Sequence, residues 1–344
     1  ESAARQAEMI AEKVRLALNQ PYALAGVEHM HQSTASIGMT LFHGLDDSTD
    51  VLLKQADVAL YQAKDAGRNR LRFFNPAMQA AIDTRTAMEN ALRNALSQNE
   101  LHLYYQPQVD QYGQTIGAEA LLRWQRPGIG IVSPAQFIPL AEETGLILPI
   151  GAWVVHSACN QLMAWAGDSR TCDLQLAINV SARQFHQADF VAQIAACIAR
   201  SGINPGRLKL ELTESVVLEN VEDVISRMQE IKALGVGFSL DDFGTGYSSL
   251  SYLKRLPLDQ VKIDQSFVRD ITVDPNDAAI VRAILAMSQS LGLNVIAEGV
   301  ETQAQQDFLH ANGCTAFQGY LFGKPMPISD WGKRLSTSPL QNEK

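Results

Sequence analysis

The chain has 344 residues, 46% hydrophobic and 19% charged, which suits a folded protein of about two domains. Its net charge of −9 argues against a non-specific DNA-binding protein, because such proteins need an excess of Lys and Arg. A small phosphate substrate held through metals remains compatible with this charge. We expect no membrane segment, since no apolar run reaches about 18 residues. The chain begins within a helical pattern, which suggests a cytoplasmic domain of a longer, sensor-linked or membrane-anchored protein.

Residues 1–75 alternate helical and strand patterns. Helices are predicted at 3–19 and 50–66, and strands at 31–42 and 71–74. Two strands are too few for an independent domain. Residues 76–100 are predicted to form a linker and a helix, in which Met88, Leu92 and Leu96 lie on one face.

From residue 101 to about 335, strand-like and helix-like stretches alternate repeatedly. Apolar strands separated by helices predict a parallel sheet covered by helices, and their number suits a (β/α)₈ barrel. A doubly wound open sheet is the alternative, but it would normally carry a Gly-rich phosphate loop after its first strand, and none is present. The stretches 101–109 and 115–124 are joined by a short turn and predict an antiparallel pair.

Polar residues recur where these strands are predicted to end. They are Glu119, Asn179, Glu211, Asp241 with Asp242, Lys262 with Asp264, Glu298 and Gln318. Each alone could be a helix cap, an edge carboxylate or a surface lysine. Together, at the end of a barrel where active sites lie, so many acidic groups require a cation.

The chemistry that this set indicates is metal-assisted hydrolysis of a phosphate ester. Oxygen ligands favour Mg²⁺ or Mn²⁺ over zinc, and several carboxylates allow two ions. A lysine beside the metals could orient the attacking water. Arg123 could bind phosphate oxygens with two hydrogen bonds, or else form a salt bridge at the barrel rim.

A series of segments then carries a family resemblance. In chain order these are Tyr105-Gln106-Pro107, Glu119-Ala120-Leu121-Leu122-Arg123-Trp124, Asn179-Val180-Ser181, Glu211-Leu212-Thr213-Glu214-Ser215, Asp241-Asp242-Phe243-Gly244-Thr245-Gly246-Tyr247, Lys262-Ile263-Asp264, Ala297-Glu298-Gly299-Val300-Glu301 and Gln318-Gly319-Tyr320. Over residues 85–335 the chain resembles an EAL domain, a cyclic-di-GMP phosphodiesterase. Residues 56–70 resemble the C-terminal end of a GGDEF (diguanylate cyclase) domain, without that family's signature hairpin, so cyclase activity is not expected.

The resemblance implies a modified TIM-like (β/α)₈ barrel with an antiparallel first strand. The implied domains are a C-terminal GGDEF-type fragment at 1–75, a linker and helix at 76–100, and an EAL barrel at 101–335. It also implies hydrolysis of cyclic-di-GMP to linear pGpG with Mg²⁺ or Mn²⁺, which lowers the level of this bacterial second messenger. The alternatives are a cyclic-di-GMP receptor that signals without turnover and an unrelated two-metal phosphatase.

Site roles follow from the resemblance, position by position. The implied metal ligands are Glu119, Asn179, Glu211 and Asp241 for the first ion. Asp241 would bridge to a second ion held by Asp242 and, directly or through water, by Glu298. Lys262 would hold the nucleophilic water, with Gln318 close by, and Gln106, Leu121 and Arg123 would contact the dinucleotide. Glu214, Gly244 and Gly246 would stabilise or shape the loop after Asp242. The family also implies a homodimer through the barrel helices beside this loop.

Overall fold

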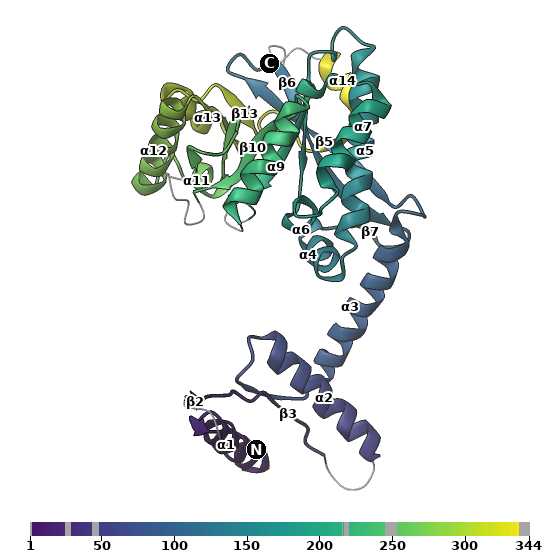
Figure 1. The fold of residues 1–344 in the computed structure, drawn as a ribbon, viewed down its shortest axis with the longest axis vertical. Helices are drawn as coiled ribbons and strands as arrows, with labels where there is room; N and C mark the ends of the chain where they lie inside the picture. The colour runs from purple at the N-terminus through teal and green to yellow at the C-terminus, as the bar shows by residue number, and fades with distance from the viewer. Residues whose placement is uncertain are drawn as a thin grey trace. The chain divides into compact units, whose positions relative to one another are not determined.

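The computed structural model describes residues 2–24, 29–42, 48–214, 216, 220–244 and 253–336. The chain divides into two compact units, Glu1–Ala91 and Leu92–Lys344 (Figure 1).

The first unit is built on a small parallel sheet. Strand β3 (Ile37–Met39) pairs with β4 (Leu71–Phe73), and helix α2 (Thr49–Asp65) lies between them in the chain. The other elements are α1 (Ser2–Leu18), the antiparallel pair β1 (Tyr22–Ala23) and β2 (Met30–His31), and most of α3 (Pro76–Ala95). Both predicted helices and the strand at 71–74 are confirmed. The strand predicted at 31–42 is replaced by the short β2 and β3, because the residues between them are small and polar.

The second unit is a closed barrel. Around the ring the strands follow the order β5, β13, β12, β11, β10, β9, β8 and β6, and β6 pairs with β5 to close it. Strand β5 is antiparallel to β6 and β13, and the other neighbours in the ring are parallel. The ring strands are β5 (Leu101–Asp110), β6 (Thr115–Arg126), β8 (Gln175–Asn179), β9 (Leu208–Thr213), β10 (Gly237–Phe243), β11 (Gln260–Ile263), β12 (Asn294–Ala297) and β13 (Ala316–Gln318). The predicted barrel with an antiparallel first strand is confirmed.

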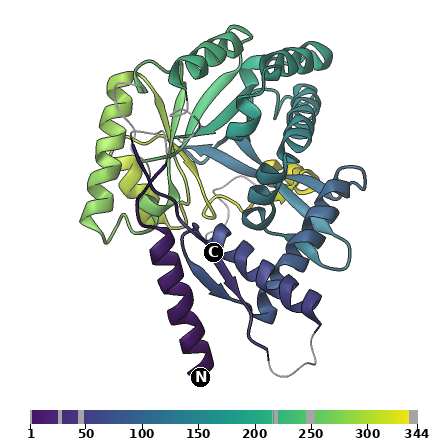
Figure 2. The ribbon, with the colours of Figure 1, turned by 60° about the horizontal axis from the view of Figure 1, so that its bottom comes forward.

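Helices surround the strands of the barrel (Figure 2). They are α4 (Pro134–Thr144), α5 (Ile147–Ala166), α6 (Ala182–Phe185), α7 (Phe190–Ser201), the 3₁₀ turn η1 (Pro205–Arg207), α9 (Val221–Ala233), α11 (Gln265–Arg269), α12 (Pro275–Leu291), α13 (Gln303–Ala311) and α14 (Ile328–Ser336). Two short strands lie outside the ring, β7 (Gly130–Val132) on β6 and β14 (Met326–Pro327) on β5. The sequence pattern also predicts a helix near 247–255, and most of this range lies outside the described residues.

Alternation along the strands separates an apolar layer from a polar interior. On β9, Leu208, Leu210 and Leu212 are almost completely buried and share one face. Lys209 and Glu211 lie on the other face and bond to residues of β11 inside the barrel. The leucines therefore pack toward the covering helices, and the interior at this point is polar.

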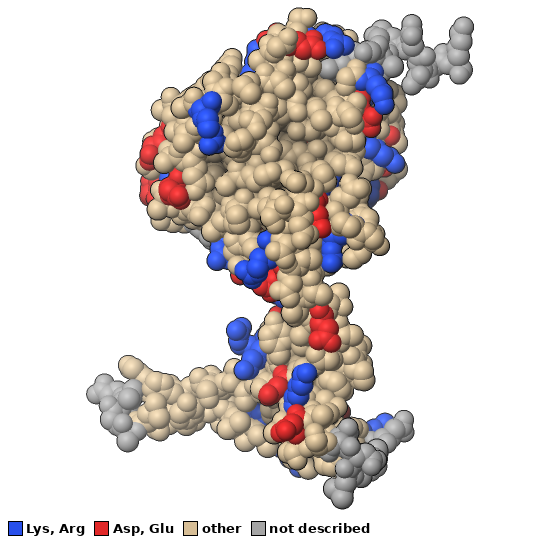
Figure 3. Space-filling model, turned by 90° about the vertical axis from the view of Figure 1, so that its right-hand side faces the viewer, with Lys and Arg blue, Asp and Glu red and all other residues tan. Residues whose placement is uncertain are grey.

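No single helix among the described residues is long and apolar enough to cross a membrane. The bent pair α4 and α5 passes such a test by length and composition, but much of α5 is buried in the barrel unit. On the face that Figure 3 shows, basic and acidic side chains are interspersed and the basic ones form no continuous patch.

Candidate active site at the carboxyl ends of the strands

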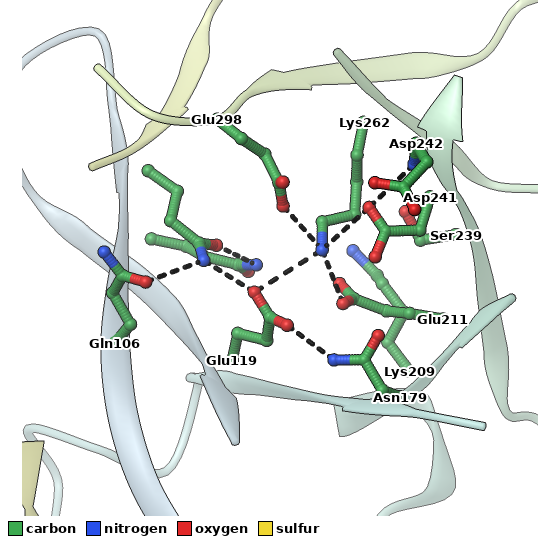
Figure 4. Close-up of polar contacts among 12 residues, drawn as sticks. Gln106, Glu119, Asn179, Lys209, Glu211, Ser239, Asp241, Asp242, Lys262 and Glu298 are labelled. Atoms are coloured by element: carbon green, nitrogen blue, oxygen red, sulfur yellow. Dashed lines mark hydrogen bonds and ion pairs between the residues drawn. The ribbon is translucent and has the colours of Figure 1, made fainter. Parts of the chain in front are cut away.

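The polar residues predicted at the strand ends meet at one end of the barrel. They are Glu119 on β6, Asn179 on β8, Glu211 on β9, Asp241 and Asp242 on β10, Lys262 on β11, Glu298 directly after β12 and Gln318 on β13. Neighbouring parallel strands end at the same edge of a sheet, and the register places Asn179 opposite Glu211. The expectation that these side chains lie close together is confirmed (Figure 4). Asp264, the other residue of the predicted set, caps α11, where its side chain accepts from the Ser266 N–H over 2.9 Å.

The ammonium group of Lys262 lies among four carboxylates (Figure 4). Its Nζ atom is 2.6 Å from oxygens of both Glu211 and Glu298, 3.3 Å from Asp241 and 3.4 Å from Glu119. Lys262 is 1% exposed. Burial opposes its charge, but the surrounding carboxylates prevail and raise the pKa of Lys262 well above its usual value.

One ammonium does not balance these acidic groups. Burial raises the pKa of Glu211 well above its usual value, and it raises the pKa of Glu298 to about 8. Burial, together with Asp241, raises the pKa of Asp242 to about 6. A carboxyl group whose ionisation is opposed in this way gains from an additional cation nearby. The site is therefore electrostatically suited to bind further positive charge.

Glu119 is held in one orientation. Asn179 Nδ2 donates to Glu119 Oε1 over 2.6 Å, and Gln318 Nε2 donates to Oε2 over 2.6 Å. Burial opposes the charge of Glu119, but Lys262 and these two donors outweigh it and lower the pKa of Glu119. Glu119 therefore stays ionised and cannot turn freely.

No group of three or more His, Cys, Asp or Glu side chains in the described segments is arranged as a metal cage. Lys262 instead takes the central position among the acidic groups. Glu211 Oε1 is buried and has no hydrogen-bond partner within the described part of the chain, so it is available as a ligand atom. Carboxylate oxygens and the Asn179 amide are the donor types that hard divalent ions prefer.

The end of β10 has an unusual backbone. Asp242 has φ 53°, its N–H donates to Asp241 Oδ1 over 2.9 Å, and Gly244 has φ 98°. The pairing with β11 is irregular between Leu240 and Phe243. Asp241 therefore points toward Lys262 while the chain turns away immediately after it (Figure 4).

The residues predicted to shape the loop are only partly covered. Glu214 is 5% exposed, and neither of its carboxylate oxygens has a partner among the described residues. Gly246 lies outside the described residues. Buried carboxylates are usually hydrogen-bonded, and residues 215 and 217–219 beside Glu214 lie outside the described residues, so its role as a loop anchor stays a prediction.

The predicted substrate-binding residues line β5 and β6. Gln106 is 8% exposed, and its Nε2 donates to Gly323 O over 3.3 Å. Arg123 and Leu121 are partly exposed, and the guanidinium carbon of Arg123 lies 5.8 Å from the centre of the Tyr104 ring. Arg123 thus lies two residues along β6 from Leu121, with its guanidinium over the Tyr104 ring.

Four further polar residues inside the barrel were not identified from the sequence: Gln108, Lys209, Ser239 and Gln260. Lys209 Nζ donates to Gln260 Oε1 over 2.9 Å, and Ser239 Oγ lies 3.4 Å from the same oxygen. Each lies two residues from a predicted site residue on the same strand. Strand alternation could have revealed them, because residues at i and i+2 face the same side.

Comparison with known families agrees with this geometry. The model of the EAL domain matches residues 89–325, and that of the diguanylate cyclase, GGDEF domain matches residues 1–70. The chain is 44% identical over 322 residues to the bifunctional diguanylate cyclase/cyclic di-GMP phosphodiesterase MucR of Pseudomonas aeruginosa, covering 93% of this chain and 47% of that protein. It is 38% identical over 330 residues to the cyclic di-GMP phosphodiesterase PdeR of Escherichia coli, covering 95% of this chain and 49% of that protein. The chain thus spans about half the length of these relatives.

Solved structures give the same result. The chain resembles the PaMucR phosphodiesterase in its c-di-GMP complex with a TM-score of 0.69 and 46% identity, over 71% of this chain and 99% of that one. It resembles the EAL enzyme Bd1971, in a form with cAMP and cyclic-di-GMP bound, with a TM-score of 0.72 and 33% identity, over 84% of this chain and 77% of that one. The chain therefore belongs to the EAL-domain family, and part of a GGDEF domain precedes its barrel.

Proposed function

We propose that this chain is a cyclic-di-GMP phosphodiesterase, which hydrolyses the cyclic dinucleotide to linear pGpG. The observation that carries the proposal is the convergence of Glu119, Glu211, Asp241 and Glu298 around Lys262 at the carboxyl ends of the strands. Relatives about 40% identical over most of the chain are named as phosphodiesterases for this substrate. A receptor without turnover would have less need of so complete a set of acidic groups.

The residues fit a pair of divalent ions, Mg²⁺ or Mn²⁺. The excess of carboxylates over ammonium groups and the unpartnered Glu211 Oε1 both favour added cations. We assign Glu119, Asn179, Glu211 and Asp241 to one ion, with Asp241 shared with a second ion that Asp242 and Glu298 would hold. When bound, such ions supply a Lewis acid for phosphoryl oxygens and lower the pKa of bound water.

The protein groups would then bind and orient the reactants. Lys262 keeps its protons, because its pKa is raised, so it would hold the attacking water and place positive charge beside the phosphate. Gln318 would lie next to this water. Gln106, Leu121 and Arg123 would bind the dinucleotide, Arg123 through its guanidinium and the phosphate oxygens. Attack of the water on one phosphorus would break the bond from that phosphorus to a ribose 3′ oxygen. One proton of the water ends on this oxygen as the 3′ hydroxyl, and the attacked phosphorus becomes the 5′-phosphate of pGpG.

The wider organisation is also part of the proposal. We assign residues 1–75 to a GGDEF-type fragment, 76–100 to a linker and helix, and 101–335 to the EAL barrel. The assembly we propose is a homodimer formed through the barrel helices beside the end of β10. Since the chain spans about half of its curated relatives, we place it as a cytoplasmic part of a longer signalling protein.

The test is incubation of the whole chain with cyclic-di-GMP and Mg²⁺, followed by chromatography of the products. The unchanged protein should release pGpG, and Glu119→Ala should lower the rate by at least about 100-fold, since even outer-shell changes at metal sites cost 10- to 100-fold. Glu230→Ala is the control, because Glu230 is an exposed carboxylate on α9. Absence of pGpG from the unchanged protein would overturn the enzyme assignment. If the protein still bound cyclic-di-GMP with Mg²⁺ present, the receptor alternative would replace it.

A further inference from the structure

Three glutamines form a buried hydrogen-bond chain that ends on Glu119. Gln108 Nε2 donates to Gln318 Oε1 over 2.9 Å. Gln318 Nε2 donates to Glu119 Oε2 over 2.6 Å and to Gln106 Oε1 over 3.2 Å. Gln108 is 3% exposed and Gln318 4% exposed, so each of these contacts is shielded from water.

The groups at the two ends of the chain fix its direction. A backbone carbonyl and an ionised carboxylate can only accept hydrogen bonds. Gln106 donates to Gly323 O, so its own oxygen faces Gln318. Gln318 then uses both of its N–H groups, one on Gln106 and one on Glu119. The Gln318 oxygen must therefore face Gln108, and Gln108 satisfies it.

Strand pairing holds the participants in place. The antiparallel register sets Gln318 of β13 directly opposite Gln108 of β5, and it sets Gln106 of β5 directly opposite Glu119 of β6. Side chains two residues apart on β5 point the same way, into the barrel. The chain thus crosses three neighbouring strands of the ring at the point where β5 runs antiparallel.

We propose that Gln108 is a positioning residue of the active site. By donating to Gln318 Oε1 it locks the Gln318 amide so that its N–H group faces Glu119. The locked amide then holds Glu119 Oε2, which fixes the carboxylate that we assign to a metal ion. Without Gln108 the Gln318 oxygen loses this donor, so the Gln318 amide is held only through its N–H groups on Gln106 and Glu119 and orients Glu119 Oε2 less firmly. This inference rests on the proposed function, because it gives Gln108 a role in the same site.

A mutant cycle tests the proposal in the whole chain. Gln108→Met removes the donor and keeps the length of the side chain, and it is compared with Gln318→Met and the double variant. Outer-shell partners of metal ligands typically contribute 10- to 100-fold, so Gln108→Met should weaken Mn²⁺ binding in calorimetry by about tenfold and lower kcat similarly. The double variant should show no greater loss of Mn²⁺ affinity and kcat than Gln318→Met alone, because Gln108 acts through Gln318.

Gln305 supplies a matched control. It is also a buried glutamine, 6% exposed, but its oxygen accepts from the N–H groups of Glu301 and Thr302 at the start of α13. Gln305→Met should lower stability and leave Mn²⁺ affinity and kcat unchanged. The proposal would be overturned if Gln108→Met and Gln318→Met lowered Mn²⁺ affinity and kcat independently and additively. It would also be overturned if Gln108→Met lowered only the stability and left Mn²⁺ affinity and kcat unchanged. If the unchanged protein makes no pGpG, the proposed function fails, and the Mn²⁺ titrations still decide the role of Gln108.

Discussion

At the scale of single residues, the charge balance of the site depends on Lys262. Its ammonium group is within 3.4 Å of four carboxylates and is 1% exposed. Buried carboxylates without a counter-ion are costly, because no water solvates them. Lys262 therefore keeps the acidic cluster assembled before any divalent ion arrives, besides the role in orienting water that we propose for it.

Replacing Lys262 with Met should destabilise the barrel strongly in metal-free buffer. Removing one partner of a buried ion pair costs about 3–5 kcal/mol, since the other charge is left uncompensated. All four tryptophans lie in the barrel unit, so urea unfolding followed by tryptophan fluorescence reports this unit alone. Added Mn²⁺ should recover part of the loss, because it replaces the missing positive charge.

Lys232→Met is the matched control. Lys232 pairs with Asp259, and both side chains are about one-third exposed. Such pairs contribute about 0–1 kcal/mol. If Lys262→Met and Lys232→Met lower the free energy of unfolding equally, the charge of Lys262 is not what compensates the buried carboxylates of the site.

Strand-end positions could be predicted from the sequence because the ends of parallel strands must meet. Glu119, Asn179, Glu211, Asp241 and Lys262 were all identified in this way, and the structure brings them together. The central place of Lys262 could not be predicted, because it depends on the side-chain directions set by closure of the barrel. Alternation along β5 could have placed Gln108 inside the barrel, but its hydrogen bond to Gln318 could not be predicted, because the antiparallel register of β5 with β13 is specified only in the folded ring.

At the scale of elements, the end of β10 determines where both aspartates point. Asp242 and Gly244 have positive φ angles, a conformation that glycine adopts readily and other residues avoid. A Cβ atom on Gly244 would lie 3.1 Å from Phe267 Cε2 and 3.3 Å from Ile284 Cδ1. The turn therefore packs closely against α11 and α12.

Gly244→Ala should lower activity and Mn²⁺ affinity more than it lowers stability. The left-handed conformation costs a non-glycine residue about 1–2 kcal/mol, and relief of the contact with Phe267 would move the neighbouring aspartates. The measurements are Mn²⁺ calorimetry, phosphodiesterase rate and urea unfolding.

Gly292→Ala separates the backbone cost from the effect on the site. Gly292 ends α12 with φ 71°, and nothing lies within 4 Å of its added Cβ. Gly292→Ala should lower the free energy of unfolding about as much as Gly244→Ala does, and it should leave Mn²⁺ affinity unchanged. Equal losses of affinity and activity in both variants would show that the turn after β10 has no special connection with the site.

Strong alternation and long amphipathic patterns predicted the ring strands and their covering helices. Short elements were missed, including β7, β14, α6 and α11, each of five residues or fewer. Segments of this length carry too little periodicity to be recognised, and their conformation depends on the strands against which they pack. The residues of β7 are extended because they pair with β6, and those of β14 because they pair with β5.

At the scale of the whole molecule, every described residue assigned to the site belongs to the unit Leu92–Lys344. That unit has a closed ring of strands and its own buried core. A solved relative with 46% identity, whose chain is 99% covered, matches only 71% of this chain. The barrel unit should therefore fold and act without most of the first unit.

The final prediction concerns where the barrel unit must begin. Leu92 and Ala95, at the end of α3, are 2% and 0% exposed and belong to the barrel unit, so this end of the helix contributes to its core. A variant beginning at Arg85 should keep the unfolding midpoint and the phosphodiesterase rate of the whole chain. A variant beginning at Gln98 keeps the contact between Glu100 and Trp124 but lacks the helix. Its free energy of unfolding should be lower by about 2–3 kcal/mol, since burying one leucine contributes about that much. Equal stability of the two variants would place the domain boundary after α3, whereas loss of folding in both would show that the barrel depends on the first unit.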